Sequence, residues 1–295
     1  AYDLISNFKI YRPNTPTTGN FTIIYTSKGC PYRCIYCTVA RTPHQSKPAN
    51  KVIEELLLLY NNYNVKLVTF FDETFTLDRQ RTIEICDEIC RKMPNLKWYC
   101  NTRVNLVDDE LLRIMHEAGC RGIAYGIESG CQSILNNVNK GITVDQARTA
   151  IRLTKKNRIK VYASFILGLP GENKETIAET FLFLKDTIPH GAQFNVAVPY
   201  PGTKLLEYAI RKGLISEYKW KELYQHHATM KSESLSPEEL EEFRKKAYKI
   251  LYFNPFWILS NIRWVLKNPE DIVLGCRYYF KSLKNLVAHD MKHAH

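Results

Sequence analysis

Three cysteines stand close together near the start of the chain. Cys30, Cys34 and Cys37 are separated by three and then two residues. Cysteine thiolates are the usual ligands of iron–sulfur clusters. Three thiolates can bind three irons of a 4Fe–4S cluster and leave the fourth iron open to a chelating small molecule. The spacing therefore indicates a 4Fe–4S site with one free coordination position.

Two kinds of segment alternate along the chain and must position these cysteines. Short runs rich in β-branched and aromatic residues predict buried strands, and longer periodic runs predict helices. The predicted strands are residues 21–26, 66–71, 97–101, 122–127, 160–167 and 193–198. The predicted helices are residues 50–63, 79–92, 108–118, 143–157, 174–187 and 204–212.

Strict alternation of strands and helices predicts a parallel sheet with helical crossovers. Six strand–helix units fall short of the eight units of a complete barrel. We therefore predict an α/β fold, an open partial (β/α)6 TIM-like barrel with a helical C-terminal extension. A doubly wound open sheet is the alternative. Both architectures place functional residues at the carboxyl ends of the strands.

The chain divides into three parts on this interpretation. Residues 1–14 are an N-terminal segment or linker remnant, residues 15–213 are the core domain, and residues 214–295 are a helical C-terminal region. Ser236 followed by proline and two acids marks a helix start there. This last region is rich in aromatic residues. Packing over the open barrel, lining a bulky apolar substrate and contact with a membrane surface all explain that content.

The cysteine loop resembles the hallmark of the radical S-adenosylmethionine superfamily. The spacing matches, and an aromatic residue, here Tyr36, stands just before the last cysteine. The resemblance extends from about residue 15 to about residue 213. It implies a 4Fe–4S cluster whose open iron binds the amino and carboxylate groups of S-adenosylmethionine. It also implies reductive cleavage to a 5′-deoxyadenosyl radical, which acts on an unidentified substrate by methyl transfer, cyclisation or rearrangement.

Polar residues after the second and third strands extend the resemblance. Asp72 and Glu73 stand where family members bind the methionyl amino group, although the usual Gly-Gly-Glu pattern is absent. Asn101 is placed to reach the cofactor, and Arg103 to bind its carboxylate in bidentate fashion. The alternatives are purely structural: the two acids start a helix near Arg79, and Arg103 forms a surface ion pair.

The later strands end in further motifs of the family. Glu128 and Ser129 belong to a Gly-Ile-Glu-Ser element whose carboxylate binds the ribose hydroxyls in the family. Gly168 belongs to a Gly-Leu-Pro-Gly-Glu turn, where glycine permits the close backbone approach that adenine binding requires. Pro199 opens a loop with a Pro-Gly-Thr element. These residues complete the predicted cofactor site.

The Pro-Gly-Thr element is common in radical enzymes that carry an N-terminal cobalamin domain. That subgroup includes methyltransferases and the anaerobic cyclase of bacteriochlorophyll synthesis. The sequence contains no Asp-x-His-x-x-Gly segment of the kind that binds cobalamin. We therefore place the chain in this lineage without its cobalamin-binding domain. Cobalamin is expected only through a missing domain or a partner.

Composition sets the expectations for partners and location. No apolar run is long enough to span a bilayer, and the N-terminus does not read as a signal peptide. We predict a cytoplasmic enzyme, with peripheral membrane contact left open. Its formal net charge of +11 comes mostly from scattered Lys and Arg, and no DNA is expected. The expected partners are a small-molecule, bulky apolar substrate and an electron donor such as flavodoxin or ferredoxin.

Two other functions stay open at this stage. One is a radical methylthiotransferase acting on RNA or protein, although such enzymes usually end in a small β-barrel. The other, from a different class, is a zinc-binding module that contacts nucleic acid. A structural zinc site normally needs four protein ligands, and the nearest spare candidate is His44. That module predicts one zinc ion and no affinity for S-adenosylmethionine.

Overall fold

The computed structural model describes residues 2–5, 7–8, 11, 19–215 and 230–267. Its central feature is a six-stranded sheet in the order β1-β4-β5-β6-β7-β8. Every neighbouring pair in this sheet is parallel. The strands are β1 Asn20–Ile24, β4 Val65–Phe70, β5 Lys97–Thr102, β6 Cys120–Glu128, β7 Lys160–Leu167 and β8 Gly191–Val196.

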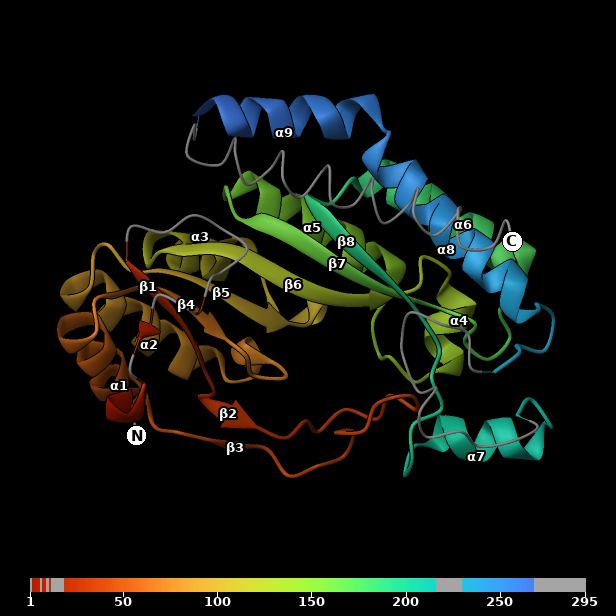
Figure 1. Ribbon diagram of the computed structural model, residues 1–295, viewed down its shortest axis with the longest axis horizontal. Helices are drawn as coiled ribbons and strands as arrows, with labels where there is room; N and C mark the ends of the chain where they lie inside the picture. Colours follow the sequence, from red (N-terminus) through yellow and green to blue (C-terminus); the bar gives the residue numbers. More distant parts are fainter. Residues whose placement is uncertain (1, 6, 9–10, 12–18, 216–229, 268–295) are drawn as a thin grey trace.

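Helices cover the outer face of this sheet (Figure 1). The helices that follow the successive strands are α1 Ala49–Asn62, α2 Arg79–Lys92, α3 Asp109–Glu117, α4 Gln132–Asn137, α5 Val144–Lys156, α6 Lys174–Thr187 and α7 Lys204–Arg211. Short 3-10 turns are η1 Tyr2–Leu4, η3 Phe75–Leu77 and η4 Val104–Leu106.

The strand order decides between the two predicted architectures. A doubly wound sheet reverses its strand order at a switch point, whereas these strands follow one another in chain order from β1 to β8. The outermost strands, β1 and β8, do not pair with each other, so the curled sheet stays open (Figure 1). The predicted partial (β/α)6 barrel is therefore confirmed.

Local capping explains why the helix boundaries agree with the prediction. The Asp108 carboxylate accepts a hydrogen bond from the Leu111 N–H at the start of α3. Gly119 follows that helix with φ of 94°, a conformation that glycine adopts readily. Thr143 and Gln146 form a capping box at the start of α5. These signals are contained in a few consecutive residues, so the sequence alone reveals them.

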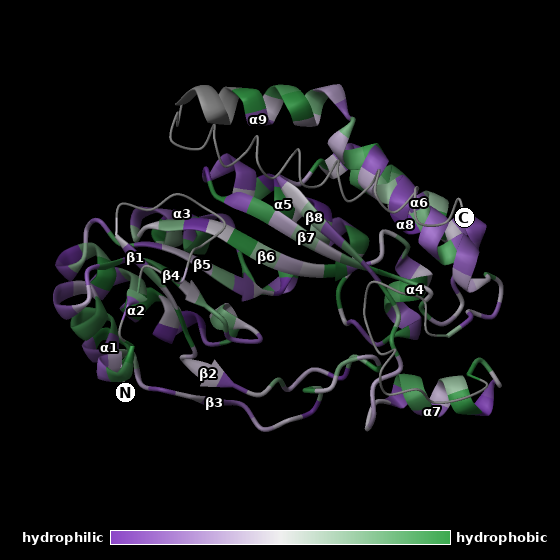
Figure 2. Cartoon of the chain, in the orientation of Figure 1, coloured by the Kyte–Doolittle hydropathy of each residue, from purple (hydrophilic) through white to green (hydrophobic). Residues whose placement is uncertain are grey.

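Apolar side chains between the sheet and the helices form the main core. Figure 2 shows in green the hydrophobic residues along these strands and helices. Trp98 lies at its centre and is fully buried. Its ring packs edge-on against Phe70, whose ring stacks on Phe75 at 4.5 Å between centroids. The Trp98 indole N–H donates to the Ala118 carbonyl at 2.8 Å, so the ring is buried without an unpaired donor.

The N-terminal segment packs on the core where it is described. Phe8 is buried beside Tyr63, and the Tyr2 hydroxyl donates to the Glu55 carboxylate at 2.6 Å. The predicted domain boundary near residue 15 lies outside the described residues. The boundary near residue 213 adjoins residues 216–229, which also lie outside them. The three-part division stays a prediction.

The C-terminal region contains two helices, α8 Pro237–Tyr252 and α9 Pro255–Lys267. Ser236 caps α8 as predicted, in a capping box with Glu239. The helical region expected here is built from two helices in its described part, because Pro255 opens the second one. The part of the expectation that concerns residues 268–295 lies outside the described residues.

Aromatic residues of α8 and α9 cover the edge strand β8. The Tyr248 hydroxyl accepts from the Phe194 N–H at 3.2 Å, and the Tyr252 hydroxyl contacts the Ala192 backbone at 3.4 Å. The Trp257 indole N–H donates to the His190 carbonyl at 3.2 Å. Unpaired strand edges are prone to association. Packing over the edge strand therefore accounts for Tyr248, Tyr252 and Trp257, whereas Phe253 and Phe256 are exposed.

None of the helices in the described part of the chain combines the length and apolarity needed to cross a membrane.

Candidate functional site

The three cysteines lie on an arm between two short strands, β2 Ser27–Lys28 and β3 Gln45–Ser46, which pair antiparallel. The sequence did not predict these strands because two residues carry no periodicity. Gly29 begins the arm with φ of 86°, and a Cβ there would lie 2.1 Å from the Pro43 carbonyl oxygen. The Cys30 N–H donates to the Thr42 hydroxyl at 2.9 Å. Close packing between its two sides therefore fixes the shape of the arm.

The tip of the arm is clamped between two helices (Figure 1). The Ile35 N–H donates to the Val138 carbonyl at the end of α4 at 3.1 Å. The Ile35 carbonyl accepts from the Leu205 N–H at the start of α7 at 2.9 Å. Cys34, beside Ile35, is buried. Backbone hydrogen bonds thus place the cysteines at the carboxyl ends of the strands.

The three thiols are close enough to influence one another. Burial raises the pKa of Cys37, and the neighbouring Cys34 and Cys30 raise it further against the effects of Val39 and Lys140. Within the described residues, no three His, Cys, Asp or Glu side chains converge as ligands of one metal ion. A 4Fe–4S cluster spreads its thiolates over separate irons. Three cysteine thiolates can each bind a separate iron of such a cluster.

Two adjacent acids after β4 differ sharply. Asp72 is fully buried, and its carboxylate accepts from the Thr26 N–H, the Thr26 hydroxyl and the Ser27 hydroxyl at 2.6–2.7 Å. Glu73 has a buried Oε2 without any hydrogen-bond partner in the described structure. Buried carboxylate oxygens are normally paired. Asp72 fastens β1 to β4, whereas Glu73 has an oxygen available to a ligand.

Neither acid starts a helix near Arg79, which was the structural alternative. Asp78 caps α2 instead, accepting from the Arg81 N–H at 3.0 Å. Arg79 pairs with Asp108 and Glu110 at 2.6 Å each. The Asn101 amide, at the end of β5, donates weakly to the Asp72 carbonyl at 3.4 Å.

Arg103 is buried beside the cysteine arm. One guanidinium nitrogen lies 3.8 Å from the Cys34 sulfur, and another donates to the Lys140 carbonyl. The guanidinium plane sits 3.6 Å from the centre of the Tyr32 ring. The surface ion pair suggested as an alternative does not form, since Asp108 pairs with Arg79. Among the described residues Arg103 has no carboxylate partner, so its charge is available to an anionic ligand.

Glu128 ends β6 in an unusual conformation. Its φ is 71°, and the pairing of β6 with β7 shifts register between Gly126 and Glu128. A left-handed conformation is strained for residues other than glycine, at a cost of about 1–3 kcal/mol. Glu128 is also buried, where it pairs with Lys140 at 2.6 Å. Strained backbone and a buried charge together mark a site shaped for more than folding.

Lys140 was not predicted from the sequence. Its ammonium group donates to Glu128 and, at 3.3 Å, to the Tyr36 hydroxyl. Burial, together with the Glu128 carboxylate, raises the pKa of Tyr36 well above its usual value. Lys140 is separated from the end of β6 by α4, so it was missed when functional residues were sought directly after the strands. The available signal was a lone lysine in a turn, between Asn139 and Gly141.

Ser129 makes protein contacts rather than facing open space. It is buried, and its hydroxyl lies 3.1 Å from the Thr180 hydroxyl and accepts from the Cys131 N–H at 3.2 Å. Pro199 is also buried, in the loop between β8 and α7. A four-residue turn, Tyr200–Thr203, follows this proline, and Thr203 caps α7. Both predicted residues are therefore buried within the protein.

The turn after β7 holds a buried acid with an unusual protonation state. Gly168 has φ of 84°, and its N–H donates to one Glu172 oxygen. The other Glu172 oxygen has no partner among the described residues. Burial raises the pKa of Glu172 to about 8, although the N–H groups of Gly168 and Leu169 oppose the rise. At neutral pH this side chain is mostly an uncharged acid.

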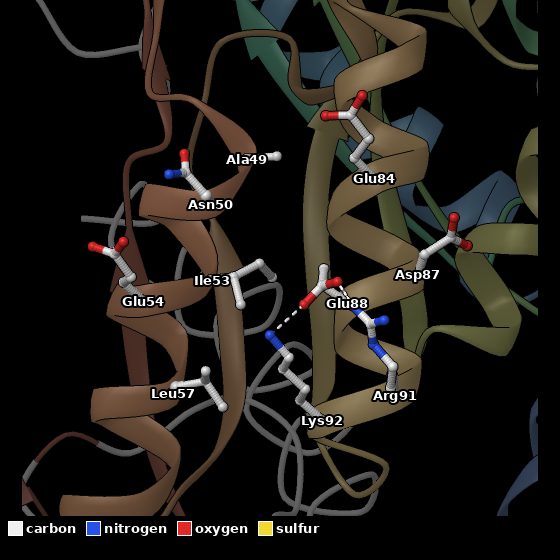
Figure 3. Close-up of a pocket in the computed structure, with 10 residues that line it drawn as sticks. All are labelled: Ala49, Asn50, Ile53, Glu54, Leu57, Glu84, Asp87, Glu88, Arg91 and Lys92. Carbon is white, nitrogen blue, oxygen red and sulfur yellow. Dashed lines mark ion pairs between the residues drawn. The ribbon is translucent and has the colours of Figure 1, made fainter.

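A hollow of about 760 Å³ lies away from the cysteines, between α1 and α2 (Figure 3). Three of its six charged side chains pair with one another. Glu88 pairs with Lys92 at 2.6 Å and also with Arg91. The hollow lies on the outer helical layer, whereas parallel barrels carry their chemistry at the strand ends. We therefore locate the functional site at the cysteine arm.

Fold and site together define an α/β enzyme that combines a thiolate cluster with buried polar groups at one end of an open parallel barrel. Residues 24–184 match the family model described as the Radical SAM superfamily. The chain belongs to the radical S-adenosylmethionine superfamily. Members of this superfamily bind a 4Fe–4S cluster and S-adenosylmethionine, so the chain is an enzyme of this class. The zinc-binding module is thereby set aside.

Similar proteins include methyltransferases and a cyclase. An uncharacterized methyltransferase of Pyrococcus horikoshii is 33% identical over 265 residues, covering 89% of this chain and 57% of the relative. The anaerobic magnesium-protoporphyrin IX monomethyl ester cyclase of Cereibacter sphaeroides is 36% identical over 187 residues, covering 61% of this chain and 31% of the relative. The chain therefore spans only part of the length of both relatives.

A solved structure shares the fold. The radical S-adenosylmethionine methyltransferase TsrM from Kitasatospora setae, with cobalamin and a 4Fe–4S cluster bound, has a TM-score of 0.61 at 19% identity. The likeness covers 76% of this chain and 47% of that chain. It supports the partial-barrel architecture independently of the sequence motifs.

Proposed function

We propose that Cys30, Cys34 and Cys37 hold the cluster and that the neighbouring strand ends bind S-adenosylmethionine. Bound together, the cluster and S-adenosylmethionine supply reductive sulfur–carbon bond cleavage and a 5′-deoxyadenosyl radical. The observation that carries the proposal is Glu128. Its left-handed backbone and buried ion pair have no evident folding purpose.

Groups without a partner at the strand ends bind different parts of S-adenosylmethionine. Glu73 accepts hydrogen bonds from the methionyl ammonium group through its unpaired Oε2. Arg103, which lacks a carboxylate partner within the described structure, pairs with the methionyl carboxylate. Asp72 supports this end of the site indirectly, because its carboxylate already accepts three hydrogen bonds.

Glu128 binds the ribose hydroxyls, and Lys140 makes that possible. The lysine occupies one carboxylate oxygen, Oε1, at 2.6 Å. The second carboxylate oxygen is thereby left to accept from ribose. Tyr36 completes this group through its hydroxyl. Ser129, Gly168 and Pro199 shape the walls around the ribose and adenine.

We infer that the reaction is methyl transfer or ring formation on a small, bulky apolar molecule. The printed functions of the relatives support this class, although this chain spans 57% and 31% of their lengths. Cobalamin, where used, comes from a domain beyond these residues or from another chain. All cysteines of the described structure are free thiols, which favours a reducing cytoplasmic location.

The ribose contact provides the test. Glu128→Ala should weaken binding of S-adenosylmethionine by ten- to a hundredfold, as expected for a lost hydrogen bond to a charged group of about 1.5–3 kcal/mol. Iron content should stay unchanged. Glu179→Ala, at an exposed acid on α6, is the matched control. Equal affinity in both variants would return Glu128 to a structural role.

Cobalamin is tested separately. Hydroxocobalamin should bind and change the product only when the additional domain or partner is present. Binding to residues 1–295 alone would contradict this part of the proposal.

A further inference from the structure

The cysteine arm has a charge pattern of its own. Residues 28–46 contain no Asp or Glu, whereas Lys28, Arg33 and Arg41 are cationic and His44 adds an ionisable ring. The three cations are exposed. None of them forms an ion pair with a carboxylate in the described part of the chain. We call these four residues the arm face.

The cations sit directly beside the cysteines. Arg33 and His44 help line a hollow of about 440 Å³, together with Pro31, Arg41, Thr42 and Pro43. The Arg41 N–H donates to the Tyr32 carbonyl at 2.9 Å and so joins the two sides of the arm. Arg41 also has φ of 62°, a conformation uncommon for its residue type. The fold thus fixes the backbone from which these charges project.

Basic residues just beyond the arm behave differently. Lys47 pairs with Glu55 at 2.7 Å, and Lys51 pairs with Glu54 at 2.7 Å. Acidic partners are therefore present nearby but absent from the arm face. Exposed and unpaired cations of one sign attract an acidic partner over several ångströms.

The cluster requires an electron from outside this chain. Cys30 and Cys37 are half-buried on the arm, next to the arm face. Electrons tunnel efficiently only over short distances. A donor seated on the arm face approaches the cluster more closely than one seated on the outer helices.

We propose that the arm face is the docking surface for a small acidic electron-transfer protein. The inference rests on the proposed function, because it presupposes a cluster on the three cysteines. In the docked complex one electron passes from the donor to the cluster, so the donor is oxidised and the cluster reduced by one electron each. Complementary charge raises the association rate and makes it sensitive to salt.

The test compares two reductants of the anaerobically reconstituted protein. Reduced flavodoxin serves as the acidic protein donor, and photoreduced deazaflavin as an uncharged small reductant. Reduction is followed by the loss of cluster absorbance after rapid mixing. The variant is Arg33→Glu with Arg41→Glu. The control is Lys97→Glu with Lys185→Glu, the same charge change at exposed residues near the opposite ends of the strands.

At low salt, the second-order rate constant with flavodoxin should fall at least tenfold in the arm variant, on the order of known steering effects. It should change less than about twofold in the control. The rates with deazaflavin should be the same in all three proteins. Affinity for oxidised flavodoxin, measured by calorimetry on the chain without its cluster, should weaken in parallel.

Several results would overturn the inference. Equal flavodoxin rates and affinities in the arm variant and the control would place docking elsewhere. Slowing with both reductants would mean that the substitutions disturb the cluster itself. Saturable binding of inorganic phosphate without binding of flavodoxin would assign the hollow to a small anion. Failure of the proposed function is distinguishable, because wild-type protein would then retain no iron for either reductant to reduce.

Discussion

The two ends of the parallel sheet treat buried polar groups differently. At the amino-terminal end, His190 accepts from the Val161 N–H at 3.1 Å, and its carbonyl accepts from Trp257. At the carboxyl-terminal end, Glu73 and Glu172 each bury an oxygen without a partner in the described structure, and Glu128 has a strained backbone. The first end is built for stability, whereas the second keeps polar groups unsatisfied for a ligand.

One buried polar atom without a hydrogen-bond partner lies away from the carboxyl-terminal end of the sheet. His116 Nδ1, near the end of α3, is buried without a partner. Burial lowers the pKa of His116, so its ring stays neutral. A neutral ring nitrogen costs less to bury than a carboxylate oxygen. Unsatisfied acids therefore remain a feature of the carboxyl-terminal end alone among the described residues.

The largest effect should come from the cysteine arm. Changing Cys30, Cys34 and Cys37 together to Ala should abolish the brown absorbance and the bound iron, because we propose that their thiolates are the cluster ligands. Far-ultraviolet circular dichroism should still report a folded chain. Cys90→Ala, at an exposed cysteine on α2, should keep the full iron content. Iron retained by the triple variant would contradict the assignment.

Glu172 should make stability depend on pH. Its folded pKa of about 8 lies above the usual 4.5, so the folded chain holds a proton that the unfolded chain releases. Its contribution is complete below pH 4.5 and is lost as pH rises through 8. Urea unfolding of the wild type and Glu172→Gln should diverge across this window, by up to about 5 kcal/mol. Parallel profiles would show that Glu172 is ionised in the folded chain.

Lys140 should stabilise the site by neutralising Glu128. Lys140→Met leaves a buried carboxylate unpaired, which should reduce the free energy of unfolding by about 3–5 kcal/mol. The double variant Lys140→Met with Glu128→Gln should recover much of this loss, because no buried charge remains. Urea titration of all three proteins at one pH measures the effect. Equal stability of the single and double variants would show that the pair is not coupled.

His190, at the opposite end of the sheet, should give a pH dependence of opposite sign. Burial lowers its pKa from 6.5 to about 4, so the unfolded chain binds a proton that the folded chain does not. Its contribution is present above pH 6.5 and is lost as pH falls toward 4. His190→Asn should flatten the wild-type profile there by about 3 kcal/mol at most. A profile unchanged by the substitution would mean that His190 titrates normally.

The smallest effect belongs to the covered sheet edge. Tyr252→Phe removes one hydroxyl that hydrogen-bonds to the backbone of β8 while keeping the ring. The free energy of unfolding should fall by about 0.5–1.5 kcal/mol. Binding of S-adenosylmethionine should stay at the wild-type value. A loss of S-adenosylmethionine binding in Tyr252→Phe would show that the covered edge of β8 affects the cofactor site, contrary to the separation of the two ends described above.

The sequence predicted most clearly what is determined locally. The bounds of α2, α6 and β7 agree with the prediction because their periodicity, and for the two helices an N-cap residue, are contained in a few consecutive residues. Contacts between residues far apart in the sequence were not predicted. Asp72 is satisfied by Thr26, which is 46 residues away. Lys140 reaches Tyr36 across 104 residues.

At the site, the positions of residues after the strands were predictable, whereas their hydrogen bonds were not. It brought the cysteine arm, Glu73, Arg103 and Glu128 to one end of the barrel, because parallel strands share that end. It did not separate Asp72 from Glu73, since their difference depends on the hydroxyls of Thr26 and Ser27, which follow β1. Hydrogen-bond satisfaction is a property of the folded chain.

The central claim is that three cysteines of this chain hold a cluster whose fourth iron receives S-adenosylmethionine. Mössbauer spectroscopy of protein reconstituted with ⁵⁷Fe tests it most directly. Addition of S-adenosylmethionine should shift the signal of roughly a quarter of the iron, because only one iron lacks a thiolate. Glu128→Ala should require a higher concentration for the same shift. A spectrum unchanged at saturating S-adenosylmethionine, or stoichiometric zinc in place of iron, would contradict the account.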